Sequence, residues 1–204
     1  SILENGYATL DTLFGMAPMI FLFLIPAVTM RSFAEEKQSG TIELLVTRPL
    51  SDWQIVGGKF LACLTLVAFA LLPTLLYYIT VYQLGETKGN LDSGGIFGSY
   101  VGLLFLAGAF VAIGIFASSL TNNQIVAFVL ATFLCFFVYL AFDALSRLPV
   151  FFGKSDDIVQ AFGIQYHYES MSRGVLDTRD IVYFLSIIAV FMAATVLTLG
   201  KRRW

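Results

Sequence analysis

The residues that could carry out chemistry in this chain are few, and their spacing argues against catalysis. His167 is the single histidine, and Cys63 and Cys135 lie in separate apolar stretches with no second cysteine or histidine near either of them. An intramembrane hydrolase needs a nucleophile beside its general base, and a metal site needs several ligands at close spacing. We therefore predict no catalytic residue, no cofactor and no metal site. The cysteines are interpreted as small buried apolar side chains, and His167 is expected at a membrane interface.

A nucleotide-binding loop is also missing from the sequence. Such a loop follows the pattern G-x-x-x-x-G-K-[ST] between a strand and a helix. At Gly58-Lys59, Trp53 stands where the first glycine belongs and Phe60 where the hydroxyl residue belongs. We therefore predict that the chain is not an enzyme and does not itself hydrolyse ATP.

The elements that must position these residues are long apolar segments. Mean hydropathy is +0.82, only 13% of the residues are charged, and no Asp, Glu, Lys or Arg occurs between Asp92 and Asp143. A membrane-spanning helix takes about 20 apolar residues, so we predict an all-α polytopic membrane protein with a single transmembrane domain over residues 1–204. Its five expected spans cover about 12–33, 55–84, 96–119, 123–143 and 181–200. Ionisable residues are absent from mid-span positions, which argues against an ion-coupled carrier.

The distribution of basic residues predicts the orientation. One side of the five-span arrangement carries seven Lys and Arg residues: Arg31, Lys37, Arg48, Lys59, Lys201, Arg202 and Arg203. The other side carries five, together with most of the acidic residues. Basic loops stay in the cytoplasm, so we predict a multi-pass membrane protein with a cytoplasmic C-terminus. Residue 1 then starts outside, and we expect a further span upstream of Ser1. Binding of nucleic acid is not expected.

The cytoplasmic connection, residues 34–54, is the most informative polar segment. Gly40 is expected to end the helix that leaves the membrane, Thr41 to cap a short helix over 41–47, and Pro49 to end it. Ser51 and Gln54 fit a capping box that opens the next span. The helix could simply rest on the inner leaflet, but such helices are rich in Lys and Arg. This segment mixes both signs of charge, and mixed charge favours a protein partner.

The pattern Glu36-Lys37-x-x-Gly40-Thr41-x-Glu43-x-Leu45, followed by Arg48-Pro49 and Gly58-Lys59, resembles the coupling-helix region of type-2 ABC exporter permeases. Within that family the chain is most similar to permease subunits associated with bacterial gliding motility. The resemblance implies a six-helix permease, here without its first span, whose cytoplasmic connection docks onto a cytoplasmic ABC ATPase dimer. It also implies a second permease subunit, as homodimer or heterodimer, and a possible gliding-motility accessory membrane protein. The implied ATPase-docking residues are Glu35, Glu36, Lys37, Gly40, Thr41, Glu43, Leu44, Leu45, Arg48 and Pro49.

The outer segment, residues 144–180, is too long for a turn and too polar to span. Ile158, Val159, Phe162 and Tyr166 recur at helical spacing, and Gly163 is a possible break. We therefore expect one or two short amphipathic helices with shallow burial at the outer interface. The resemblance implies that these helices cap the exit of a pathway.

Small residues four positions apart predict close helix packing inside the membrane. The pairs are Gly108-x-x-x-Ala112, Gly114-x-x-x-Ser118, Ala127-x-x-x-Ala131 and Ala189-x-x-x-Ala193. Each pair can serve contacts within one subunit or between two subunits. Pro26 and Pro73 lie inside spans, where each can bend its helix as a static kink or a hinge.

Two functions remain open at the level of sequence. The first is an export permease that moves a hydrophobic or amphiphilic substrate, or exerts force on an envelope partner, with ATP hydrolysed by another subunit. The second is a non-transporting scaffold that passes the conformational change of the ATPase to an envelope assembly. An ion channel is disfavoured, because no span presents the polar residues that conduction requires.

Overall fold

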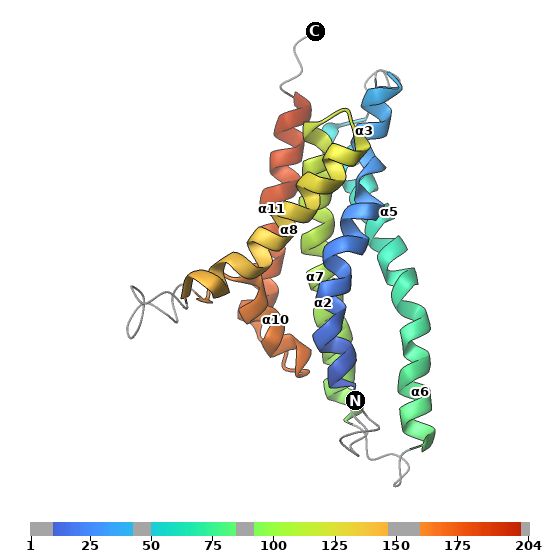
Figure 1. Ribbon diagram of the computed structural model, residues 1–204, viewed down its shortest axis with the longest axis vertical. Coiled ribbons are helices and arrows are strands. Elements are labelled where there is room, and N and C mark those ends of the chain that lie inside the picture. Colours follow the sequence, from blue (N-terminus) through green and yellow to red (C-terminus); the bar gives the residue numbers. More distant parts are fainter. Residues whose placement is uncertain (1–9, 43–49, 85–91, 147–159, 201–204) are drawn as a thin grey trace.

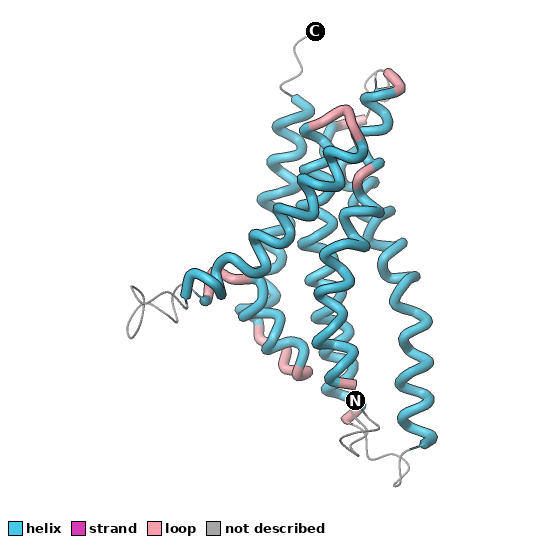
Figure 2. Tube along the Cα trace, in the orientation of Figure 1, coloured by secondary structure: helices cyan, strands magenta, loops and turns pink. Residues whose placement is uncertain are grey.

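The computed structural model describes residues 10–42, 50–84, 92–146 and 160–200, and all regular structure within these ranges is helical (Figures 1 and 2). In chain order the elements are α2 (Asp11–Thr29), α3 (Arg31–Gln38), α5 (Asp52–Leu71), the 3-10 helix η1 (Leu72–Thr74), α6 (Leu75–Leu84), α7 (Ser93–Leu120), α8 (Gln124–Ser146), α10 (Ile164–Ser172) and α11 (Thr178–Gly200). The all-α fold expected from the sequence is confirmed.

Five helical segments of the described residues are long and apolar enough to cross a membrane. They are Asp11–Gln38, Asp52–Gln83, Ser93–Leu120, Gln124–Ser146 and Thr178–Gly200. Figure 1 shows the α3 end, the turn between α7 and α8 and the end of α11 together at one end of the bundle. The start of α2 and the end of α6 lie at the opposite end. The prediction of five spans in a polytopic membrane protein is confirmed.

Helix α7 forms the centre of the bundle. It packs against α2, α3, α5, α8, α10 and α11, and most of its residues from Gly98 to Ser119 are buried. Small residues allow this, because they let neighbouring backbones approach closely. Gly108 lies against Ile188 of α11, and Gly114 lies against Thr29 of α2. These two predicted small-residue positions therefore serve contacts within the chain, whereas Ala189 on α11 is exposed.

The helix ends and breaks follow the local signals of the sequence. Ser51 and Gln54 form the predicted capping box: Gln54 N–H donates to Ser51 Oγ at 3.3 Å, and Ser51 N–H donates to Gln54 Oε1 at 2.9 Å. Gly40 has a φ of +71°, just after the end of α3. Pro73 lies in η1, where the span changes from α5 to α6. In Figure 1, α6 diverges from the rest of the bundle beyond this point.

Helix α10 differs from the expected surface helix. It starts after Gly163, as the sequence suggested, but it packs against α7, α8 and α11 and buries Ile164, Tyr168 and Met171. Of the predicted apolar positions, Phe162 is 62% exposed and Tyr166 is 52% exposed, so both remain available to a membrane interface. Ile158 and Val159 lie outside the described residues.

Close approach of α10 to α7 depends on two glycines of α7. A Cβ at Gly102 would lie 2.7 Å from Met171 Cβ, and one at Gly98 would lie 2.6 Å from Gly174 O. Gly174 itself has a φ of +81°, which favours glycine. Ser99, which lies between Gly98 and Gly102 on α7, donates from its Oγ to Ser172 O at 2.8 Å. The described part of the outer segment around α10 therefore packs into the core of the bundle.

Candidate functional site

The segment predicted to dock an ATPase begins on α3 and the turn after it. Glu35, Gly40 and Thr41 are exposed at the end of the bundle, whereas Glu36 and Lys37 are half-buried and turn toward other helices. The remaining predicted docking residues, Glu43, Leu44, Leu45, Arg48 and Pro49, lie outside the described residues, as does most of the predicted helix over 41–47. The docking role of the whole set stays a prediction.

Glu36 is held by Lys59 of α5. Lys59 Nζ lies 2.6 Å from Glu36 Oε1, donates also to Ser32 O, and lies 4.7 Å from the centre of the Phe33 ring. Both charged side chains are mostly buried, and Phe33 beneath them is fully buried. An ammonium group over an aromatic face is attracted by the ring. The contacts therefore fix α3 to the first turns of α5.

Lys37 and two serines connect α3 to the end of α7. Lys37 Nζ donates to Ser119 O. Ser118 Oγ accepts from Phe33 N–H at 3.0 Å and from Ala34 N–H at 3.1 Å, and donates to Met30 O at 2.9 Å. We call these contacts of α3, with Lys59 of α5 and with Ser118 and Ser119 of α7, the α3 joint.

The α3 joint was missed at the sequence level. Lys59 was noticed only as one of the basic residues of its side and in a Gly-Lys pair, and Ser118 only as a small residue. The available signal was a lone basic residue about two turns into an apolar span, because such a charge needs a partner. What the sequence cannot supply is the identity of that partner, since Glu36 lies 23 residues away.

A second polar cluster lies where α10 meets α11. His167 Nδ1 lies 2.7 Å from Asp180 Oδ1, His167 Nε2 lies 2.8 Å from Ala161 O, and the ring stacks on Tyr183 at 3.9 Å between centroids. His167 is only 9% exposed and Asp180 only 6%. The expectation of an interfacial histidine was therefore wrong: the imidazole is buried because both of its nitrogens have partners.

Neighbouring hydrogen bonds complete the attachment of the outer segment. Tyr168 O–H donates to Phe14 O of α2 at 2.7 Å, and burial raises the pKa of Tyr168. Tyr183 O–H donates to Phe162 O at 2.6 Å. Asp177 precedes α11 and accepts from Arg179 N–H at 3.1 Å, a hydrogen bond that holds the pKa of Asp177 below its usual range. The two tyrosine bonds join parts of the chain that are far apart in sequence, whereas the Asp177 bond is local to the start of α11.

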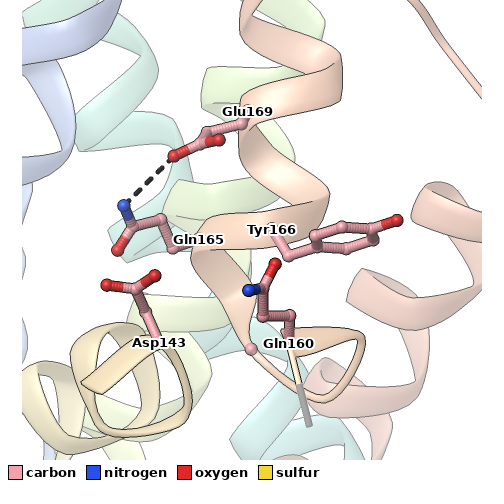
Figure 3. A pocket seen from close by; sticks show the side chains of 6 residues that line it. Asp143, Gln160, Gln165, Tyr166 and Glu169 are labelled. Carbon is pink, nitrogen blue, oxygen red and sulfur yellow. Dashed lines mark hydrogen bonds between the residues drawn. The ribbon is translucent and has the colours of Figure 1, made fainter. Parts of the chain in front are cut away.

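Two hollows border this cluster. The smaller, of about 30 Å³, is lined by Asp143, Gln160, Gly163, Gln165, Tyr166 and Glu169 (Figure 3). Gln165 Nε2 donates to Glu169 Oε1 at 3.1 Å within it. The larger measures about 460 Å³ and is lined by residues of α10, of the start of α11 and of the turn between them, including Arg173, Arg179 and Asp180. The lining of the smaller hollow is mainly polar, whereas the larger hollow exposes polar and apolar atoms in similar amounts.

Neither cluster is arranged for catalysis. A general base needs a free nitrogen within reach of a nucleophile, and both nitrogens of His167 already contact oxygen atoms. The described residues contain no group of three or more His, Cys, Asp and Glu side chains that could hold a metal ion. Cys63 and Cys135 are buried and free, as predicted. The α3 joint and the His167 cluster instead connect helices at opposite ends of the bundle.

The fold and these two clusters define a multi-pass membrane protein whose polar contacts hold helices together. A sequence profile of the ABC-2 family transporter proteins matches residues 3–202. The match extends over almost the whole chain, and the chain belongs to this family of ABC transporter membrane proteins.

Individual relatives agree with this assignment. The chain is 30% identical over 115 residues to the probable multidrug ABC transporter permease YbhR of Escherichia coli K12, and equally to the YbhR protein of Escherichia coli O157:H7. The matched stretch covers 56% of this chain and 30% of the length of each relative. The similarity is therefore to part of a longer permease.

Proposed function

We propose that this chain is the permease subunit of an ABC export system in which a separate cytoplasmic ATPase dimer hydrolyses the ATP. Membership of the ABC-2 family supports a membrane subunit of an ABC system. The observation that carries the coupling role is the α3 joint: helix α3 is fixed to α5 and α7 immediately before the Gly40 turn. A segment that emerges from so firm an attachment can transmit force to the spans.

The proposed docking site for the ATPase is the cytoplasmic segment 34–54. Mixed charge supports a protein partner over the lipid surface, since the exposed Glu35 is followed by Glu43 and Arg48 in the same segment. Closure of the ATPase dimer would move the short helix that starts after Thr41 as a rigid lever, and the attached spans would shift with it. In this proposal the protein resides in the bacterial inner membrane and its C-terminus lies in the cytoplasm.

The proposed assembly contains a second permease subunit, identical or related. Support comes from the small residue Ala189, which is exposed on α11 and therefore free to pack against another chain. The substrate class that suits the apolar spans is hydrophobic or amphiphilic, and the multidrug permease name of the YbhR relatives supports transport. Likeness to GldF, the gliding-motility permease subunit, supports a link to gliding, with an accessory membrane protein as a further partner.

The substitution Glu43→Arg tests the docking proposal. The protein and its cognate ATPase are reconstituted in proteoliposomes, and ATP hydrolysis and movement of a fluorescent amphiphile are measured in parallel. We expect hydrolysis without transport in the variant, because the reversed charge disrupts the contact while the spans stay folded. Asn122→Arg, which adds a positive charge in the exposed turn between α7 and α8, is the matched control and should transport normally. Unchanged transport in Glu43→Arg would contradict the docking site.

The same preparation separates the permease from the alternative, a non-transporting scaffold that conveys the movements of the ATPase to an envelope assembly. A permease moves a lipid, a saccharide-linked lipid or another amphiphile in step with hydrolysis. A scaffold changes conformation in step with hydrolysis and moves none of them. Mass spectrometry of lipids that copurify with the intact complex identifies which compounds to test first.

A further inference from the structure

The helix is interrupted between α2 and α3, and no side chain next to the interruption in the sequence caps the start of α3. Met30 ends α2, where its N–H donates to Pro26 O at 2.9 Å, and it also precedes the first residue of α3. The first N–H groups of any helix lack partners within that helix. A serine, threonine, aspartate or asparagine commonly supplies an oxygen at this position, and Met30 has none.

Ser118 of α7 supplies that oxygen from another helix. Its Oγ accepts from Phe33 N–H at 3.0 Å and Ala34 N–H at 3.1 Å, and its hydroxyl donates to Met30 O at 2.9 Å. Ser118 is fully buried, so water cannot replace it. The hydroxyl therefore bridges both sides of the break, accepting from the start of α3 and donating to the carbonyl that precedes it.

The backbone geometry one turn earlier brings Ser118 to this place. Gly114 lies against Thr29, and a Cβ at Gly114 would overlap Thr29 Oγ1 and come within 2.9 Å of Thr29 Cβ. Thr29 itself donates to Ile25 O at 2.9 Å and so needs no partner on α7. The pair Gly114-x-x-x-Ser118 thus combines a close approach with a polar contact at the break.

We propose that Ser118 is a positioning residue that sets the direction of α3 and passes movement of the cytoplasmic segment to α7. This inference rests on the proposed function. A helix break with unpartnered N–H groups would bend under load, and the movement would be absorbed at Met30. With Ser118 in place, α3 moves together with α7, the central helix that contacts five other spanning or outer elements besides α3.

Ser118→Ala tests the proposal without preventing folding. When the hydroxyl is lost, α2 and α3 can straighten, so that Phe33 N–H donates to Thr29 O within one continuous helix. Transport per ATP should fall roughly fivefold or more, the factor that corresponds to one hydrogen bond worth about 1 kcal/mol. ATP hydrolysis should continue. Ser99→Ala is the matched control, because Ser99 is a buried serine of the same helix that bonds to Ser172 O at the opposite end.

A structural measurement accompanies the assay and does not depend on the ATPase. Ser39 and Leu197, both exposed, are replaced by cysteine and spin-labelled in a background with Cys63 and Cys135 replaced by alanine. The distance between the two labels, measured by electron paramagnetic resonance, reports the direction of α3 relative to α11. Ser118→Ala should shift the distance distribution, and Ser99→Ala should leave it unchanged.

The outcomes separate this inference from the proposed function. An unchanged distance in Ser118→Ala overturns the positioning role, even if the wild-type complex transports nothing. A shifted distance with unchanged transport per ATP, or equal loss of coupling in Ser99→Ala, overturns the role in coupling. Failure of the wild-type protein to respond to any ATPase contradicts the proposed function alone, because the distance measurement still decides whether Ser118 positions α3.

Discussion

His167 shows how a single residue fixes the outer segment of this protein. Its two nitrogens contact Asp180 and Ala161 O, and its ring stacks on Tyr183. Removing one partner of a buried hydrogen-bonded pair leaves the other polar group unsatisfied, whereas replacing both by apolar groups can be nearly neutral. His167 and Asp180 therefore stabilise the fold as a pair and not as two separate residues.

The substitution His167→Phe follows from this pairing. Phenylalanine preserves the stack on Tyr183 but leaves the buried Asp180 side chain without its partner, at a cost of about 2 kcal/mol, or roughly 6 °C in melting temperature for a chain of this size. Thermal unfolding in detergent measures the loss. The double variant His167→Phe with Asp180→Leu should recover most of it. Tyr166→Phe, on an exposed neighbour, should change little. A double variant as unstable as the single one would contradict the pairing.

At the scale of elements, the close approach of α2 and α7 depends on Gly114. Gly114→Ala places a methyl group against Thr29, so the two helices must separate, at a cost of about 1–3 kcal/mol in the free energy of unfolding. The matched variant is Gly15→Ala on α2, where a Cβ meets nothing within 4 Å. Unfolding in denaturant should show destabilisation of Gly114→Ala alone. Equal stability of the two variants would show that the approach contributes nothing.

The elements themselves were largely predictable from the sequence, and their side-chain partners were not. Absence of charge over long stretches predicted the five spans, because hydrocarbon excludes charged groups. Ser51, Gln54 and Gly40 predicted helix ends, because capping depends on near neighbours. The burial of α10 against other helices was not predicted, because it includes His167, a polar residue whose partners lie 6 and 13 positions away.

The candidate site was predictable only in outline. Sequence reasoning identified the cytoplasmic segment and included Glu36 and Lys37 in it, but it assigned their side chains to an external partner. The structure directs both toward α5 and α7 instead. Periodicity and composition say which segment is polar, whereas the choice between an internal and an external partner depends on how the helices pack.

At the scale of the whole molecule, the bundle determines which polar segments lie on the same side of the membrane. The end of α3, the α7–α8 turn and the end of α11 lie together at one end of the bundle (Figure 1). Labelling any one of them from one side of the membrane therefore reports the side of all three. The basic residues assigned to this end predict that it faces the cytoplasm.

Cysteine labelling in intact cells and inverted vesicles tests this orientation. Single cysteines replace Ser39 and Asn122 at one end and Leu176 at the other, all at exposed positions, in a background without Cys63 and Cys135. We expect a membrane-impermeant maleimide to label Leu176→Cys in intact cells, and Ser39→Cys and Asn122→Cys only in inverted vesicles. The reverse pattern would place the segment after Gly40 outside the cell, where a cytoplasmic ATPase cannot reach it. Docking at Glu43 and transmission through Ser118 would then both lose their driving force, because the α3 joint would face the wrong compartment.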